Sequence, residues 1–162
     1  MTVTAVLVES LGERASRLNH KAWSLPFDAV DPTAADDLFA YLKNDGDKDI
    51  ILEQVDLIST VAGICELFRV TGTAAGVTAF APVNKTNNAG DMPDASLSGY
   101  GVDITGLTDV GKYAFIELVA VTARDYKIPH GGVRIKKTEA VALSWTQATG
   151  ALTGALHIYE EP

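Results

Sequence analysis

Short apolar segments separated by closely spaced turn residues run through this sequence. Turn signals recur roughly every ten residues, a spacing typical of all-β sandwiches and barrels. Within several segments apolar and polar positions alternate, so that Val141, Leu143 and Trp145 fall on one face, and residues 156–159 follow the same pattern. A period of two indicates a strand that buries one face. We therefore predict an all-β fold, an antiparallel β-sandwich of two stacked sheets.

About nine segments are expected to be strands on this pattern. Residues 35–43 also fit a helical period, because Leu38, Phe39 and Leu42 share a 3.6-residue spacing. A helix is therefore the alternative prediction for this segment. Short connections predict that consecutive strands pair with each other, since a parallel crossover needs a dozen or more residues. The expected strands are residues 35–43, 49–59, 64–70, 77–83, 97–105, 114–123, 133–137, 140–146 and 155–160.

Turns and loops are predicted from glycine, proline and asparagine. Residues 44–47, Asn-Asp-Gly-Asp, favour a tight hairpin, because Asp-Gly supplies the positive φ that such hairpins need. Residues 71–73, Thr-Gly-Thr, indicate another turn, and Pro26 and Pro32 indicate a loop. Residues 84–96 are polar and are expected to form a long surface loop, a kind of segment that often packs on a partner.

The length of 162 residues and an apolar content of 47% fit one domain, which needs no disulfide or metal to hold its core. Residues 35–162 are expected to form the sandwich. Residues 1–34 are expected to form an N-terminal arm with an entry strand or loop. Within this arm Leu11, Ala15 and Leu18 have helical spacing, which Gly12 weakens, so the segment is either a short helix or an arm ordered on a neighbour.

The formal net charge of −8 restricts the partners of this protein. An acidic surface repels phosphate, so neither nucleic acid nor an anionic membrane is expected as a partner. No stretch reaches the roughly 20 apolar residues that span a bilayer. The first ten residues lack a basic region before their apolar stretch, so synthesis in a cytoplasm is expected. The single cysteine, Cys65, lies in an apolar run and is expected to be a small buried hydrophobe.

Motifs for catalysis or metal binding are not found in the sequence. The three histidines, His20, His130 and His157, lack the spacings of zinc sites, and Gly131 and Gly132 after His130 indicate a turn. The alternation of aspartates at 45, 47 and 49 resembles half of a calcium loop, but residue 56 is Asp where such a loop places Glu, so a solvated turn is favoured. We therefore expect that the protein is not an enzyme and that it binds neither a cofactor nor a metal. A pair of catalytic carboxylates, as in a hydrolase, remains an alternative, because such a pair is defined by the distance between the two groups in the fold and not by their spacing in the sequence.

Two groups of side chains are candidates for binding. Arg134, Lys136 and Lys137 form the densest basic cluster, which is either an ordinary solvated face or a contact with an acidic patch on a protein partner. Five aromatic residues offer a sugar-stacking platform, although the Val141–Leu143 alternation favours a core position for Trp145. These aromatic residues are Trp23, Tyr100, Tyr113, Tyr126 and Trp145.

The order of segments resembles that of small virion proteins of tailed bacteriophages, the jelly-roll cement or decoration proteins of the outer capsid surface. The resemblance covers roughly residues 36–160 and rests on soft patterns of turns and alternation. The segments that carry it are residues 38–44, 49–52, 72–73, 78–84, 101–107, 140–145 and 156–159.

The resemblance implies a jelly-roll sandwich, a homo-oligomer (dimer or trimer) and binding to the major capsid protein on the exterior of a virion. A structural role without catalysis is the expected function. A carbohydrate-binding β-sandwich module, or a virion adhesin or fibre component, is the alternative. The contact residues expected on this basis come from the N-terminal segment, the Asn-rich loop and the basic strand: Leu11, Arg14, Arg17, Leu18, Asn84, Asn87, Asn88, Arg134 and Lys136.

Overall fold

The computed structural model describes residues 22–85 and 98–161, and these residues are almost entirely strands and the turns between them. A 3₁₀ turn, η1 (Pro129–Gly131), separates two of the strands. In chain order the strands are β1 (Ala22–Val30), β2 (Asp37–Lys43), β3 (Ile50–Ser59), β4 (Gly63–Ala75), β5 (Thr78–Ala79), β6 (Val83–Asn84), β7 (Gly99–Tyr100), β8 (Thr105–Leu118), β9 (Arg124–Lys127), β10 (Val133–Ile135), β11 (Ala140–Trp145) and β12 (Leu152–Glu160). No helix in these two ranges is long and apolar enough to cross a membrane.

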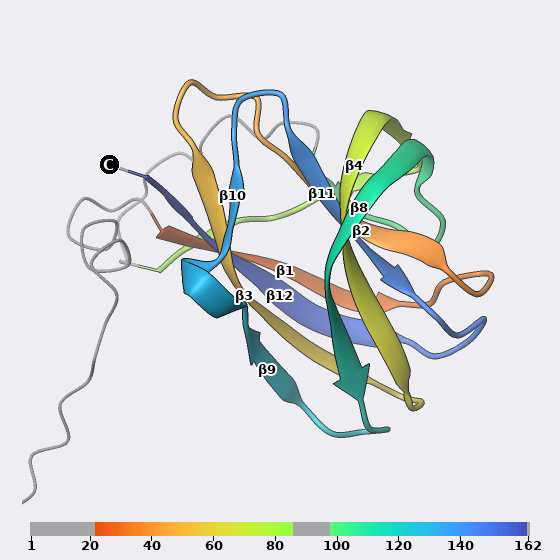
Figure 1. Cartoon of the computed structure of the whole chain (residues 1–162). Helices are drawn as coiled ribbons and strands as arrows, with labels where there is room; N and C mark the ends of the chain where they lie inside the picture. The colour runs from red at the N-terminus through yellow and green to blue at the C-terminus, as the bar shows by residue number, and fades with distance from the viewer. Residues whose placement is uncertain (1–21, 86–97, 162) are drawn as a thin grey trace, which may run out of the picture.

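The strands form two antiparallel sheets that pack face to face (Figure 1). Sheet A has the order β10-β3-β12-β1-β6. Strand β9 also pairs with β3, on the same side of β3 as β10. Sheet B has the order β5-β7-β2-β11-β4-β8. The all-β sandwich predicted from the alternation is therefore confirmed. Residues 37–43, for which a helix was the alternative prediction, form strand β2.

The pairing is that of a jelly roll. Strand β1 pairs with β12, β2 with β11, β3 with β9 and β10, and β4 with β8, as in a long hairpin folded over on itself. The expectation that consecutive strands pair is wrong, because none of the described strands is bonded to the next one in the chain. The connections after β1, β2 and β3 each cross from one sheet to the other, and a short loop can do this as easily as it closes a hairpin.

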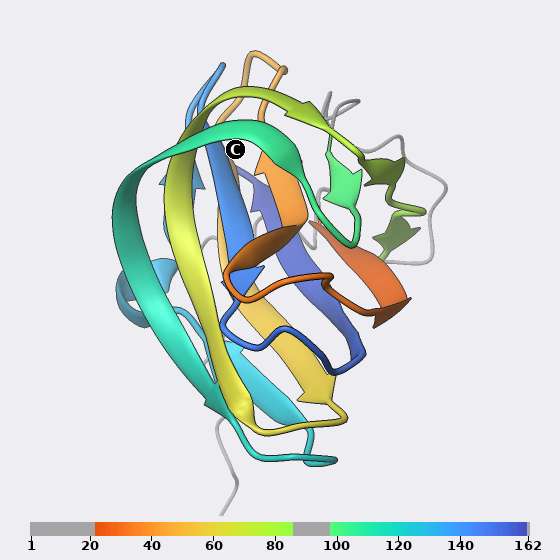
Figure 2. The same cartoon turned by 90° about the vertical axis from the view of Figure 1, so that its right-hand side faces the viewer.

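The main core lies between the sheets. Inward side chains of both sheets meet there, among them Trp23, Leu52, Leu143 and Trp145. Strand β11 is buried at every position, because its outward residues Ala140 and Ala142 lie under a second apolar cluster on the outer face of sheet B. This cluster also contains Tyr41, Val70 and Ile104, and it is packed against Leu38, Phe68, Ala74, Val77 and Leu107. Figure 2 shows β4 and β8, which supply much of this cover, as long and strongly curved strands.

Several expected boundaries are wrong. Strand β1 pairs within sheet A, so the described part of the sandwich begins at Ala22, in the segment 1–34 that was expected to form an arm with an entry strand or loop. Pro26 lies in this strand and not in a loop: β6 covers only Trp23 and Ser24, so the stretch with Pro26 has no partner on that side in the described structure. Residues 71–73 continue β4, and the segment 77–83 divides into β5 and β6, which belong to different sheets. Strand β9 was not expected, and β8 begins at Thr105, before the expected start at 114.

The turn after β2 forms for a different reason from the one predicted. Gly46 does not have a positive φ. Instead the Asn44 side-chain oxygen accepts a hydrogen bond of 2.9 Å from the Gly46 backbone N–H, as in an Asx turn. The turn leads from sheet B to sheet A, so it does not close a hairpin.

Candidate functional site

One side of the sandwich is open, where β8 of sheet B faces β9 and β10 of sheet A. A groove of about 650 Å³ lies there, between Tyr113, Ala114 and Phe115 of β8 and the chain from Tyr126 to Arg134. Figure 1 shows β9, η1 and β10 following one another along this edge of sheet A. We call this cavity the edge groove. Ile128 and Val133, which belong to the main core, line it as well.

Exposed apolar side chains gather beside the edge groove. Among the described residues, all large hydrophobic side chains that are exposed lie on β4, on β8 or just after β8, except Val83 and Val102. Phe115 is 68% exposed, and Val121, just past the end of β8, is 74% exposed. We call Val110, Tyr113, Phe115, Val119 and Val121 the β8 edge. Tyr113 and Phe115 both line the edge groove, and an exposed apolar patch marks an interaction site more often than scattered single residues do.

The strand part of the β8 edge also carries unpaired backbone groups, whereas Val121 beyond it donates its N–H to the Ser59 carbonyl at 2.7 Å. Strand β8 pairs with β4 on one side, and no described strand pairs with it on the other. Three irregularities interrupt its register with β4; at one of them Ala114 pairs with Leu67 and Lys112 with Phe68, so Tyr113 is an extra, bulged residue. A bulge can redirect a side chain and limits uncontrolled pairing along an edge strand. The stretch after Tyr113 keeps regular pairing up to Leu118.

A strained turn forms the opposite wall of the edge groove. His130 has a φ of +61°, a left-handed conformation that is uncommon for residues other than glycine. At Gly132, φ is +99°, and a Cβ would lie 2.5 Å from the Leu52 carbonyl oxygen. Only glycine lets the turn approach β3 this closely. The turn expected from His130, Gly131 and Gly132 is confirmed.

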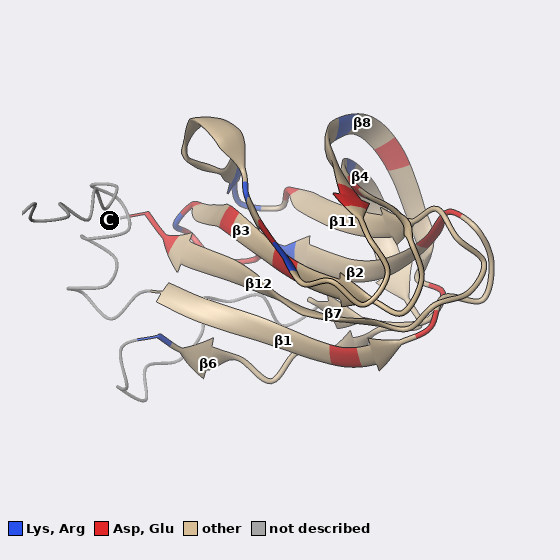
Figure 3. Ribbon diagram, turned by 90° about the horizontal axis from the view of Figure 1, so that it is seen from below, with Lys and Arg blue, Asp and Glu red and all other residues tan. Residues whose placement is uncertain are grey.

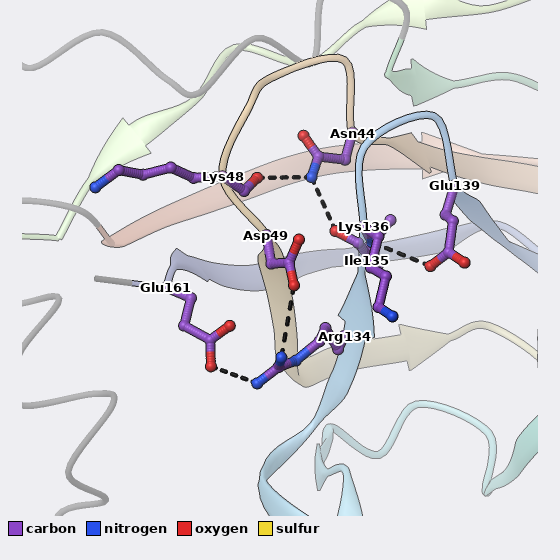
Figure 4. Close-up of polar contacts among 8 residues, drawn as sticks. All are labelled: Asn44, Lys48, Asp49, Arg134, Ile135, Lys136, Glu139 and Glu161. Atoms are coloured by element: carbon purple, nitrogen blue, oxygen red, sulfur yellow. Dashed lines mark hydrogen bonds and ion pairs between the residues drawn. The ribbon is translucent and has the colours of Figure 1, made fainter.

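Acidic side chains of this chain pair with two of the three residues in the basic cluster, and Figure 4 shows the pairs of Arg134. Arg134, on β10, forms ion pairs with Asp49, at 3.6 Å, and with Glu161. Lys137 pairs with Asp47 at 2.5 Å; this hydrogen bond lowers the pKa of Asp47 and raises the pKa of Lys137. Lys136 stays exposed, with its backbone N–H donating to Glu139. The aspartates that resemble half of a calcium loop therefore serve as partners for cations of this chain.

The expected contact residues do not form one patch where the structure describes them. Asn84 ends β6, at the edge of sheet A opposite to β10, where Arg134 lies. Four strand-to-strand steps, or roughly 19 Å, separate these two edges. Leu11, Arg14, Arg17, Leu18, Asn87 and Asn88 lie outside the described residues.

The aromatic platform is divided between core and groove. Trp145 is buried, as expected, and its Nε1 donates to the Thr149 carbonyl at 3.1 Å. Trp23 is buried as well. Tyr100 packs against Phe27 and Phe80. Only Tyr113 and Tyr126 of the five residues line the edge groove, where Phe115 joins them.

Titratable groups in the described part of the chain include the buried Cys65 and a His157–Asp56 pair. No three His, Cys, Asp or Glu side chains there are placed to hold a metal. The His157 Nε2 lies 2.6 Å from Asp56, whose other oxygen accepts from Gln54 at 2.5 Å, whereas the second ring nitrogen, Nδ1, is buried without a hydrogen-bond partner, so no described nucleophile is paired with this histidine. Cys65 is fully buried, as expected, and burial raises the pKa of its thiol, so the reactive thiolate is disfavoured.

The β8 edge was missed by the sequence analysis. Gly106, Asp109 and Gly111 interrupt the alternation of residues 105–113, so the strand was expected to begin only at 114. Tyr113 and Phe115 stand two apart, across the start of the strand expected at 114–123, and this spacing places both on one face of an extended strand. No known protein family, curated protein or solved structure matches this chain.

Proposed function

We propose that this chain is a structural protein of a tailed-bacteriophage virion, which binds the outer surface of the capsid and stabilises it as a cement or decoration protein. The observation that carries this proposal is the β8 edge, which joins unpaired backbone groups to exposed apolar side chains beside a groove. An edge strand of this kind favours binding to other protein, either a further copy of the chain or the major capsid protein.

Binding through this edge stabilises a capsid by mass action. A protein that binds only the assembled lattice shifts the equilibrium toward that lattice. A contact of ordinary size buries roughly 1,600 Å² in total. The β8 edge and the rim of the edge groove would supply the apolar centre of such a contact, and the polar side chains around them its rim.

The charge distribution supports a place on the exterior of a particle. Acidic residues are spread over both sheets, whereas basic residues are few (Figure 3). The pairs of Arg134 with Asp49 and of Lys137 with Asp47 further reduce the positive charge that is free to meet nucleic acid. A net charge of −8 disfavours contact with packaged DNA.

Co-sedimentation with capsids that lack this chain tests the proposal. The double variant Phe115→Ser/Val119→Ser removes apolar surface from the β8 edge, and Val83→Ser/Val102→Ser removes two exposed apolar side chains located elsewhere. We expect the wild-type chain and the second variant to sediment equally with capsids. The β8 variant should bind at least roughly thirtyfold more weakly, equivalent to about 2 kcal/mol, because truncating a central aromatic residue costs that much.

Both variants should unfold at the wild-type urea concentration, because surface substitutions change stability by only about 0.5 kcal/mol. Absence of sedimentation of the wild-type chain with capsids would refute capsid binding. Equal binding by the β8 variant would refute this edge as the contact.

A carbohydrate-binding module is the second candidate, favoured by the aromatic lining of the edge groove. Tyr113 and Tyr126 could stack on sugar rings, and Arg134 offers donors to hydroxyl groups at the same groove. A glycan array separates the candidates. Saturable glycan binding that Tyr126→Ala abolishes, without capsid binding, would support the module and contradict the capsid proposal.

A further inference from the structure

A second groove, distinct from the edge groove, lies on the outer face of sheet B. Its volume is about 340 Å³, and residues of β2, β4, β8 and β11 line it. The apolar side chains Leu38, Phe68 and Leu107 form part of its wall and belong to the second apolar cluster. A volume of this size fits a side chain or a small molecule. We call it the face groove.

An unsatisfied hydroxyl group lies in the face groove. Ser144 is 2% exposed, and its Oγ has no hydrogen-bond partner in the described structure. It points to the outer face of sheet B, because it continues the side of β11 that carries Ala140 and Ala142. Leu38 and Glu66 are its cross-strand neighbours, and both line the groove too. A buried hydroxyl group without a partner is costly, and a polar ligand in the groove would satisfy it.

Three carboxylates line the face groove. Asp36 precedes β2, Glu66 lies on β4 and Asp109 lies on β8. Glu66 pairs with Lys112 at 2.6 Å, and the Asp109 carboxylate accepts the Gly111 N–H at 2.7 Å. The three carboxylates outnumber the single ammonium, so the groove keeps a surplus of negative charge.

The protein already places one cation against these walls. The ammonium of Lys112 lies 5.2 Å from the centre of the Phe68 ring while it pairs with Glu66. An aromatic face beside a carboxylate is favourable for a cation, and more so when the site is partly desolvated. The remaining carboxylates, Asp36 and Asp109, together with the Ser144 hydroxyl, offer acceptors for a second cation.

We propose that the face groove binds the side chain of an arginine presented by a protein partner. A guanidinium carries five N–H donors in a planar fork, which suits several acceptors better than the compact ammonium of lysine does. Its aliphatic stem would lie against Leu38 and Leu107. This site shares strand β8 with the β8 edge but none of its residues, and it does not depend on capsid binding.

Titration of the ¹⁵N-labelled chain with Nα-acetyl-arginine methylamide tests the proposal. Its neutral isostere, Nα-acetyl-citrulline methylamide, serves as the matched probe. We expect the arginine probe to shift backbone amide signals at Leu38, Phe68, Leu107 and Ser144, with an affinity in the millimolar range. The citrulline probe should bind at least roughly tenfold more weakly, because hydrogen bonds to charged groups contribute more than about 1.5 kcal/mol.

Matched variants identify the site. Asp36→Asn/Asp109→Asn removes two charges but keeps an acceptor for Gly111 and tolerates the φ of +68° at residue 36, so the fold is retained. Asp103→Asn/Asp125→Asn removes the same charge at exposed positions outside the groove. The first variant should lose at least roughly tenfold in affinity and the second less than roughly twofold. Ser144→Ala should weaken binding by about tenfold without any change of charge.

Equal affinity for the arginine and citrulline probes would overturn the proposal. So would equal loss in the two double variants, or signal shifts confined to residues outside the face groove.

Discussion

Asn44 joins two turns that lie far apart in the sequence (Figure 4). It is fully buried, and its side-chain amide donates to the carbonyls of Lys48 and Ile135, both at 2.8 Å. Its backbone N–H donates to Glu139, and its carbonyl accepts from Thr138. One side chain therefore connects the turn after β2 with the end of β10, and it does so with both its donors and its oxygen in use.

Replacement of Asn44 should destabilise the fold. Asn44→Ala leaves two carbonyls and one N–H without their partner, so we expect a loss of about 2–4 kcal/mol in the free energy of unfolding. Asn44→Asp keeps the acceptor for Gly46 but places a carboxylate near two carbonyl oxygens, so its loss should be at least as large. Urea unfolding monitored by tryptophan fluorescence measures both losses.

The control for this prediction is Lys48→Ala. Lys48 offers Asn44 only its backbone carbonyl, and its own ion pair with Glu160 spans 3.5 Å at an exposed ammonium. The change should cost less than about 1 kcal/mol. A similar cost for Asn44→Ala and Lys48→Ala would contradict the role assigned to the Asn44 side chain.

At the scale of elements, β11 is the strand most enclosed by its neighbours. It lies between β2 and β4, with the main core on one face and the second apolar cluster on the other. The sequence predicts the first of these faces, through Val141, Leu143 and Trp145. The small residues Ala140 and Ala142 gave no comparable signal for the second face, although their size is what allows the cover to approach.

A charge on the outward face of β11 should therefore be severely destabilising. Ala142 is 1% exposed, and Ala142→Asp would bury a carboxylate without a partner, at a cost of about 3–5 kcal/mol. Ala120→Asp places the same group at an exposed position after β8 and should change stability by less than about 0.5 kcal/mol. Thermal unfolding measures the stability of both variants. An effect of Ala142→Asp as mild as that of Ala120→Asp would show that the outer cluster does not cover this strand.

Sequence patterns predicted strands better than they predicted pairing. Alternation identified β2, β3, β11 and β12, although one bulge interrupts the period in β2 and another in β3. It failed at β1, where Pro26 suggested a loop, and at β8, where glycines and bulges break the period. Pairing was predicted wrongly because loop length alone does not distinguish a hairpin from a crossing between sheets.

The candidate site was predicted less well than the fold. Arg134 was singled out as basic, but its partners Asp49 and Glu161 come from other parts of the chain and are brought to it only by folding. The β8 edge depends on which strand is left at the end of a sheet, and this is a property of the pairing. Local sequence cannot supply either fact.

At the scale of the whole molecule, the sandwich presents two surfaces of different character. The open side offers apolar contacts and an unpaired strand, whereas the outer face of sheet B offers a small acidic groove. Both surfaces use β8, the face groove at Leu107 and Asp109 and the edge groove at residues 113–115, but they share no lining residue, so substitutions at one should leave binding at the other unchanged. This independence lets the proposed capsid contact and the proposed arginine site fail or succeed separately.

The central claim is that the β8 edge is the surface through which this domain docks on other protein. Hydrogen–deuterium exchange of the chain, alone and bound to capsids, tests it most directly. We predict that amides between residues 113 and 118 exchange at least roughly tenfold more slowly in the bound state. The exchange of amides in β6, which lies at the edge of sheet A away from β10, should be unchanged. Unchanged exchange in β8, with protection appearing at β6 or on the outer faces of the sheets, would contradict the account.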